Sequence, residues 1–210
     1  MPIIRQMLEF GMQAMWLELF RDDVESFVRE GARQRFNALN EAVSIGAMSG
    51  DNETVKDSVK FLDQLHADLD VKHFQRVCKS LTGGETMYLH YRVASNYVHP
   101  SLYQADLYLA EAESPSGIEF VTNPRLPSAE AWLGTATCFL VSGCLAWERV
   151  DRARLHSATL KGYARELGIN SRRPAMTNEG FLASNKADRA RRERAKERKR
   201  PGERDVGGPR

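Results

Sequence analysis

The chain has 210 residues, of which 42% are hydrophobic and 28% charged, a composition typical of a soluble globular protein. This length supports one well-buried core and an appendage. No N-terminal stretch combines a basic segment, a short apolar segment and a small-residue cleavage site, so we expect no secretory signal and a cytoplasmic location. The three cysteines, Cys78, Cys138 and Cys144, lack metal-ligand spacing and predict reduced core thiols.

Apolar residues recur at helical spacing through most of the chain. Helices are predicted, in chain order, over residues 2–20, 22–47, 53–70, 73–81, 85–99, 100–112, 129–149 and 151–168. The Pro- and Gly-containing stretch 113–128 is expected to be a connecting loop, with a short extended piece as an alternative. Strand alternation and internal repeats are missing from the sequence. The prediction is therefore an all-α protein with a helical bundle over residues 1–169.

Local signals add detail to the first helices. Arg5 and Glu9 stand four positions apart, which is the spacing of an ion pair on one helix face. Asp51 and Asn52 are both candidate caps for the helix that follows them.

The C-terminal segment, residues 170–210, is predicted to be a disordered basic tail. From Lys186 to Arg210 it has eleven Lys and Arg against five Asp and Glu, a net charge of +6, which leaves −4 for residues 1–185. Such a segment has too few apolar residues to offset its ordering entropy, with transient helix before Pro201 as an alternative. A basic tail of this kind either holds phosphate backbones or acts as a solubilising extension.

One apolar run, residues 131–147, has seventeen residues without a charge and approaches the length that crosses a bilayer. Gly, Thr and Ser residues dilute it, and basic residues do not flank both ends. We therefore expect a fully buried central helix or a dimer-interface helix, and no membrane association.

The helix predicted over 85–99 has an unusual polar strip. Tyr88, Arg92, Ser95 and His99 follow helical spacing along one line. Apolar residues stand on both sides of this line, Met87, Tyr91, Ala94 and Val98 on one side and Leu89, Val93 and Tyr97 on the other. The pattern predicts a helix packed on two flanks with the strip between them, ending before Pro100.

Several common chemistries have no support in the sequence. It contains no P-loop and no GxGxxG, HExxH or GxSxG motif. The remaining histidines do not cluster with carboxylates at metal-ligand spacing. We therefore expect neither a metal nor a cofactor, and the strip remains as the candidate site.

Arg92 followed by six residues and His99 resembles the Arg-x(4–6)-His signature of the HEPN superfamily, a group of compact helical domains. The leading helix "IIRQMLEFGMQAMWL" and the later "YRVASNYVHPS" are similar to uncharacterised prokaryotic HEPN-like proteins, and the resemblance covers roughly residues 3–165. Two features depart from the family pattern. Val93 replaces the polar residue that usually follows the arginine, and the chain lacks the leading helices of many relatives, so an upstream natural start is one alternative.

The resemblance implies metal-independent RNA cleavage by two copies of the motif that meet in a homodimer. Attack by the RNA 2′-hydroxyl needs a base, an acid and a cation for the developing charge, and two pairs of Arg92 and His99 would supply them. Supporting roles fall to Tyr88, Ser95, Asn96, Glu9 and Arg5. The resemblance also implies a toxin–antitoxin or phage-defence setting, with an antitoxin as a partner.

Two other interpretations stay open. A non-catalytic HEPN-like module would bind RNA, a nucleotide or a protein partner with the same residues. An unrelated helical interaction protein would use Arg92 and His99 only to satisfy neighbouring carboxylates and carbonyls, with Glu9 as a partner for Arg92.

Overall fold

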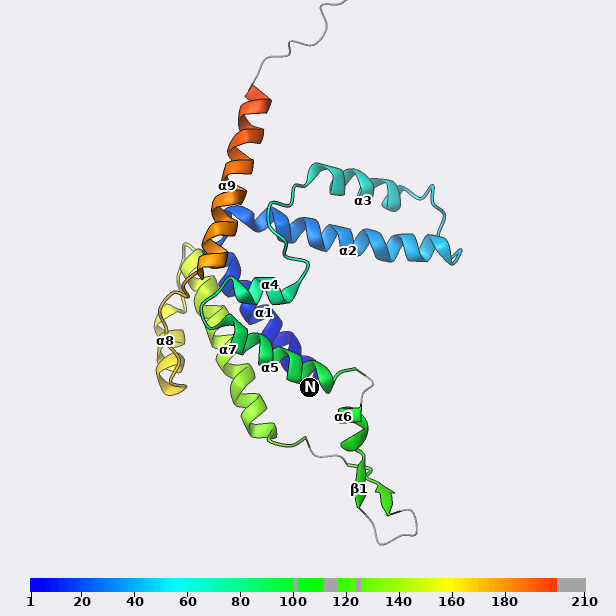
Figure 1. Cartoon of the computed structure of the whole chain (residues 1–210), viewed down its shortest axis with the longest axis vertical. Helices are drawn as coiled ribbons and strands as arrows, with labels where there is room; N and C mark the ends of the chain where they lie inside the picture. The colour runs from blue at the N-terminus through cyan, green and yellow to red at the C-terminus, as the bar shows by residue number, and fades with distance from the viewer. Residues whose placement is uncertain (100–101, 112–116, 124–125, 200–210) are drawn as a thin grey trace, which may run out of the picture. The chain divides into compact units, whose positions relative to one another are not determined.

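A computed structural model describes residues 1–99, 102–111, 117–123 and 126–199 (Figure 1). The elements in these ranges are α1 (Pro2–Leu19), the 3-10 helix η1 (Arg21–Asp23), α2 (Val24–Ser44), α3 (Glu53–Gln64), α4 (Phe74–Lys79), α5 (Gly84–Asn96), α6 (Leu102–Asp106), β1 (Leu109–Glu111), β2 (Ile118–Phe120), α7 (Ala129–Val150), α8 (Ser157–Glu166) and α9 (Asn178–Lys199). Helices make up most of the described chain. The predicted all-α class is confirmed.

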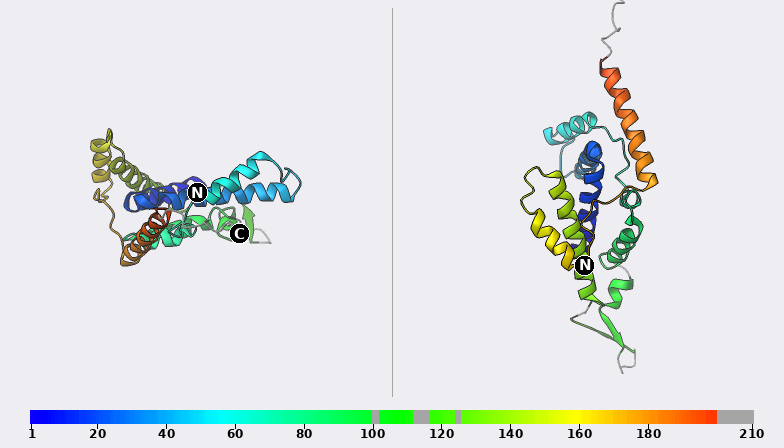
Figure 2. Two further views of the ribbon diagram at one scale, coloured as in Figure 1. Left: turned by 90° about the horizontal axis from the view of Figure 1, so that it is seen from above. Right: turned by 90° about the vertical axis from the view of Figure 1, so that its left-hand side faces the viewer.

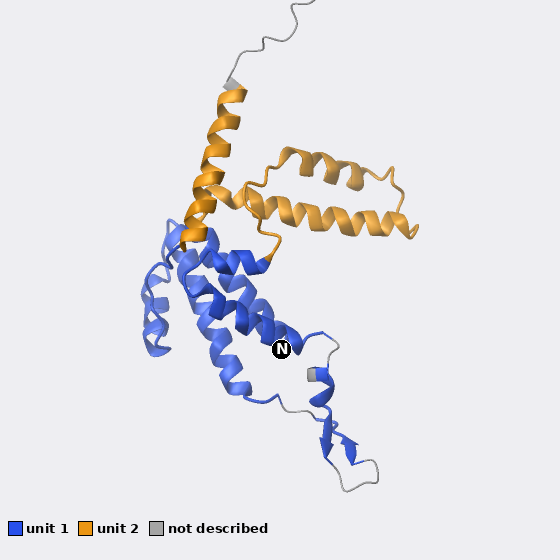
Figure 3. Cartoon of the chain, viewed as in Figure 1, with its two compact units in different colours: residues 1–19, 74–176 blue, residues 20–73, 177–210 orange. Residues whose placement is uncertain are grey.

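The chain divides into two compact units (Figure 3). Unit 1 consists of residues 1–19 and 74–176, and unit 2 of residues 20–73 and 177–210. The prediction of one bundle over residues 1–169 is therefore corrected, because α2 and α3 group with α9 rather than with the helices around them in sequence.

In unit 1, α1 lies alongside α7 and also contacts α4 and α5 (Figures 1 and 2). Its inner face contributes Leu8 and Met12, which are 0% and 1% exposed. The approach to α7 is close at Gly11, where an added Cβ would lie 2.6 Å from the Phe139 carbonyl oxygen. A side chain there would push the two helices apart, so this glycine sets their separation.

The position of α5 depends on the turn that precedes it. Gly83 has a left-handed backbone with φ of +78°, and a Cβ on Gly84 would lie only 1.8 Å from the Cys78 carbonyl oxygen. Both positions thus require glycine. The turn is also held to the end of unit 1, since the Thr82 amide donates to the Ala175 carbonyl at 2.9 Å.

Two predictions about the middle of the chain need correction. α5 ends at Asn96, three residues before the predicted end, because the chain turns at Tyr97 and Val98 ahead of a proline. The helix predicted over 100–112 is only the short α6, and the following residues form β1. β1 pairs antiparallel with β2, whose Ile118 and Phe120 favour an extended backbone.

In unit 2, α3 begins at the predicted cap, where the Asn52 side chain accepts a hydrogen bond from the Thr54 amide at 2.9 Å. α3 packs along α2. The segment after α3 is held by the buried Ser26 hydroxyl, which accepts hydrogen bonds from the Asp68 and Leu69 amides.

The predicted disordered tail is wrong over residues 178–199, which form α9. Ala187 is 1% exposed, and Arg191 and Arg194 pair with Asp23 and Asp68 of the same unit. Ion pairs to the buried Asp23 and the half-buried Asp68 thus give order to a helix that has few apolar residues. Residues 200–210, the end of the predicted tail, lie outside the described residues.

α7 is less buried than predicted. It is the one helix in the described ranges that is long and apolar enough to cross a membrane, and only 33% of its apolar window is buried. Leu133, Leu140 and Trp147 are 59%, 48% and 67% exposed. The expectation of a fully buried central helix is therefore wrong, and α7 presents an apolar face.

Candidate functional site

Of the predicted polar strip, Tyr88, Arg92 and Ser95 lie on α5, whereas His99 lies three residues past its end. Arg92 and His99 are exposed, whereas Ala94 on the opposite side is 0% exposed. The expectation that both flanks are packed is wrong for one flank, because Leu89 and Val93 are 60% and 36% exposed. The helix is therefore anchored along one side and open along the other.

An aromatic cluster anchors the packed side. Tyr91 accepts a hydrogen bond from the Arg5 guanidinium at 2.7 Å, and the Arg5 Cζ lies 5.1 Å from the centroid of the Tyr91 ring. The Phe74 ring is 4.4 Å from that of Tyr91, and the Tyr88 ring is 6.0 Å from it. A cation over an aromatic ring combined with ring packing stabilises a partly buried guanidinium. Arg5 thus ties α1 to α5.

This arrangement changes the predicted role of Arg5. Its side chain reaches Tyr91, and no ion pair joins it to Glu9, although both residues lie in the described range. Its Nε atom is buried without a hydrogen-bond partner. Arg5 therefore holds α1 against α5, the helix that carries Arg92. It is not part of the polar strip.

At the end of the strip, two hydrogen bonds hold the backbone. The Ser95 hydroxyl donates to the Tyr91 carbonyl at 2.8 Å, and the His99 amide donates to the Ser95 carbonyl at 3.3 Å. Ser95 therefore uses its proton within the helix and keeps its oxygen lone pairs as acceptors. Asn96, the last residue of α5, is half-buried.

Glu9 is half-buried on α1 and forms no ion pair with Arg92, both being described residues. The interpretation in which Glu9 simply neutralises Arg92 is therefore contradicted. Burial, together with the negative charge of Glu9, raises the pKa of the Cys78 thiol to about 12. Cys78 remains protonated at neutral pH, as expected of a core thiol and not of a nucleophile.

Two members of the aromatic cluster, Phe74 and Tyr91, were not among the predicted site residues. Phe74 belongs to a different predicted helix, and Tyr91 was assigned only to the apolar flank. The sequence contained a partial signal, since Tyr88 and Tyr91 are three residues apart and Arg5 is the one basic residue in the helix predicted over 2–20. Only the packing of α1, α4 and α5 brings these side chains together.

The site consists of the exposed Arg92 on α5 and the exposed His99, which lies three residues past the end of that helix. In the described ranges no three His, Cys, Asp or Glu side chains gather at metal-binding distance. A guanidinium binds phosphate oxygens, and an imidazole transfers protons near neutral pH. Comparison with protein-family models, with curated proteins and with solved structures gives no match for this chain.

Proposed function

We propose that the protein is a metal-independent endoribonuclease of the HEPN type, acting in the cytoplasm as a homodimer. The observation that supports this most directly is the open side of α5, where Arg92, Leu89 and Val93 are exposed, together with the exposed His99 that follows the end of this helix. Two exposed apolar side chains next to the motif favour pairing of α5 with the same helix of a second copy. Such pairing brings two arginines and two histidines to one phosphate.

The chemistry uses only side chains. One His99 removes the proton of the 2′-hydroxyl, the second protonates the leaving 5′ oxygen, and the Arg92 side chains offset the charge that develops on the phosphate. The products are a 2′,3′-cyclic phosphate and a 5′-hydroxyl. An exposed guanidinium without an ion pair to Glu9 is available for this role.

The deciding experiment incubates mixed RNA with the protein in EDTA. We expect cleavage with 2′,3′-cyclic phosphate ends in the wild type, and a loss of at least about 100-fold in His99→Ala and in Arg92→Ala. His90→Ala is the matched control, because His90 lies on the same helix and its Nδ1 is 2.9 Å from the Thr86 carbonyl oxygen. Cleavage that survives His99→Ala contradicts the proposal.

Pairing through α5 is tested separately with Leu89→Glu, which leaves Arg92 and His99 themselves unchanged. We expect this variant to lose cleavage because the charge separates the two helices.

RNA that stays bound but uncut by the wild type would favour the non-catalytic module. As the biological role, we propose a toxin or phage-defence effector with an antitoxin partner. Expression of the wild type in bacteria should then be toxic, and His99→Ala should relieve that toxicity.

A further inference from the structure

α1 and α7 of unit 1 form a continuous apolar face distinct from the motif helix α5. Ile3 and Phe10 are 72% and 64% exposed and stand seven residues apart on α1. Leu133, Leu140 and Trp147 repeat the same seven-residue spacing along α7. The spacing places each set on one side of its helix. An exposed apolar surface of this size often marks an interaction site.

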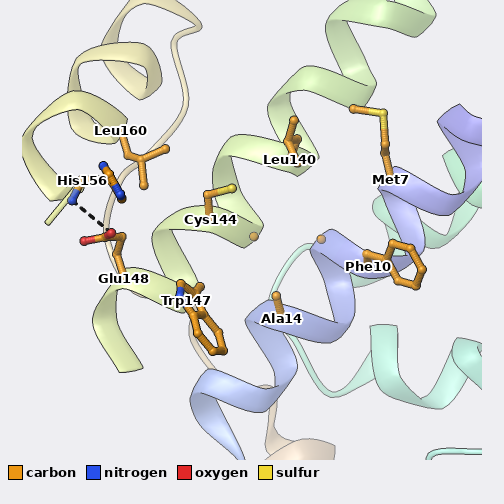
Figure 4. Close-up of a pocket in the computed structure, with 11 residues that line it drawn as sticks. Met7, Phe10, Ala14, Leu140, Cys144, Trp147, Glu148, His156 and Leu160 are labelled. Carbon is orange, nitrogen blue, oxygen red and sulfur yellow. Dashed lines mark hydrogen bonds between the residues drawn. The ribbon is translucent and has the colours of Figure 1, made fainter. Parts of the chain in front are cut away.

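The two helices run in the same direction, so the two sets form one face. Gly11 of α1 lies against Gly143 of α7, with only 3.0 Å between an added Gly143 Cβ and the Gly11 Cα, and Glu18 further along α1 pairs with Arg149 further along α7. Phe10 and Trp147 consequently border the same groove (Figure 4).

The groove between the helices has a volume of about 470 Å³ and an almost wholly apolar lining. Small residues, Gly11, Ala14, Gly143 and Cys144, form part of it. A cavity of roughly 150 Å³ already holds a benzene ring. The exposed rings of Phe10 and Trp147 thus stand beside a groove that is large enough to hold such rings. A surface that carries both the rings and the groove can pair with a second copy of itself.

The exposed area also suits a second copy. Phe10 and Trp147 together expose about 280 Å² if a full aromatic side chain has roughly 150–250 Å². Ile3, Leu133 and Leu140 add about 200 Å² at roughly 110 Å² for a complete aliphatic side chain. One side of a stable homodimer buries about 800 Å², of which about 65% is apolar, or roughly 500 Å². The face matches that apolar area.

We infer that α1 and α7 form a two-fold interface at which a second copy of this chain docks, with Phe10 and Trp147 of each copy entering the groove of the other. The resulting contact is a four-helix layer made of α1 and α7 from both copies. This interface does not rest on the proposed function, because it uses a different face from Leu89 and the motif on α5. A chain that pairs through both faces forms an assembly larger than a dimer.

The test measures mass by light scattering from about 1 to 100 μM for the full chain and for Trp147→Glu and Leu140→Glu. We expect each substitution to halve the wild-type mass and to raise the dissociation constant at least about 100-fold, because it buries a charge in the apolar contact. Trp147→Phe should retain the wild-type mass. Phe120→Glu is the matched control, since Phe120 is 78% exposed on the β2 strand, away from α1 and α7. Circular dichroism checks that every variant keeps its helices.

Three results overturn the inference. If the wild type is strictly monomeric, the interface does not exist. If Trp147→Glu and Leu140→Glu both keep the wild-type mass, the copies pair through another surface. A monomer that floats with lipid vesicles, and no longer does so after Trp147→Glu, assigns the face to a membrane surface. Leu89→Glu separates this contact from α5 pairing, because it removes only the contact on which the proposed ribonuclease depends.

Discussion

At the residue scale, the charges that matter most to this fold are carboxylates buried against arginines. The Glu18 and Asp23 side chains are each 1% exposed, and they pair with Arg149 and Arg191 respectively. Arg149 donates two hydrogen bonds to Glu18, at 2.7 and 2.8 Å. A carboxylate is kept charged in such a position only by a partner that also satisfies its hydrogen bonds. These pairs fix which helices pack together.

The carboxyl groups of unit 2 respond to their arginines in opposite ways. Burial raises the pKa of Asp23 above 3.8 despite the opposing effect of Arg191. For Asp68, the hydrogen bonds from Arg194, at 2.7 and 2.5 Å, outweigh burial and lower the pKa below 3.8. Asp68 therefore stabilises the folded unit when ionised, whereas the ionised form of Asp23 is disfavoured by folding.

We predict that Asp68→Asn lowers the free energy of unfolding, and that its deficit relative to the wild type depends on pH. The contribution of a carboxyl with a lowered pKa is fully present above the unfolded pKa of about 3.8 and is lost as the pH falls through the folded value. The deficit should thus stay constant from pH 7 to about 4.5 and shrink at lower pH. Urea titrations at several pH values measure it.

Asp51→Asn is the control for this prediction, because the Asp51 side chain is 94% exposed. It should change the free energy of unfolding by less than about 0.5 kcal/mol at any pH. A deficit in Asp68→Asn that grows toward low pH contradicts the ion-pair interpretation.

At the element scale, α9 shows how a polar sequence becomes an ordered helix. It has Lys or Arg at most positions after Lys186 and buries little apolar surface apart from Ala187. Isolated helices of this kind depend on partners for their stability. Arg191 and Arg194 find theirs in Asp23 and Asp68, which belong to distant parts of the sequence.

Truncation of the chain after Asn185 should therefore destabilise unit 2. It removes both arginines and leaves Asp23 buried without its partner, a loss of about 3 kcal/mol or more. Thermal unfolding followed by circular dichroism should show a lower Tm. A chain that ends at Lys199 is the matched control, because it keeps every α9 contact described above. Equal Tm values for the two truncated chains would show that α9 adds nothing to the fold.

At the scale of the whole molecule, the two units have separate sets of stabilising contacts. Glu18, Arg149 and Arg173 lie within unit 1, and the carboxylates that pair with α9 lie within unit 2. Compact units with their own contacts open as separate cooperative units. The chain crosses between them near Phe20 and again near His73 and Met176.

Glu18→Gln should then weaken unit 1 selectively, because Arg149 and Arg173 lose the charge that they neutralise. We expect amide hydrogen exchange to accelerate at least about 100-fold in peptides from α1 and α7, and to stay at the wild-type rate in α2 and α3. Glu166→Gln, at the exposed end of α8, is the control and should leave both units unchanged. An equal acceleration in both units would show that the chain opens as one cooperative body.

The sequence by itself determined most of the helices, because helical periodicity and caps are local properties. The bounds of α1, α7 and the Asn52 cap agree with the prediction. It also determined the line of Tyr88, Arg92 and Ser95 on α5, since residue spacing along a helix needs no knowledge of its neighbours.

Only the tertiary structure decided which helices belong together and which faces remain open. Order in α9 comes from Asp23 and Asp68, more than a hundred residues away, and no local pattern contains such a contact. Exposure of Leu89 and Trp147 likewise depends on what packs against α5 and α7. An apolar residue in a sequence indicates that burial is favourable, but whether the chain itself covers it is settled only when all the helices have been packed.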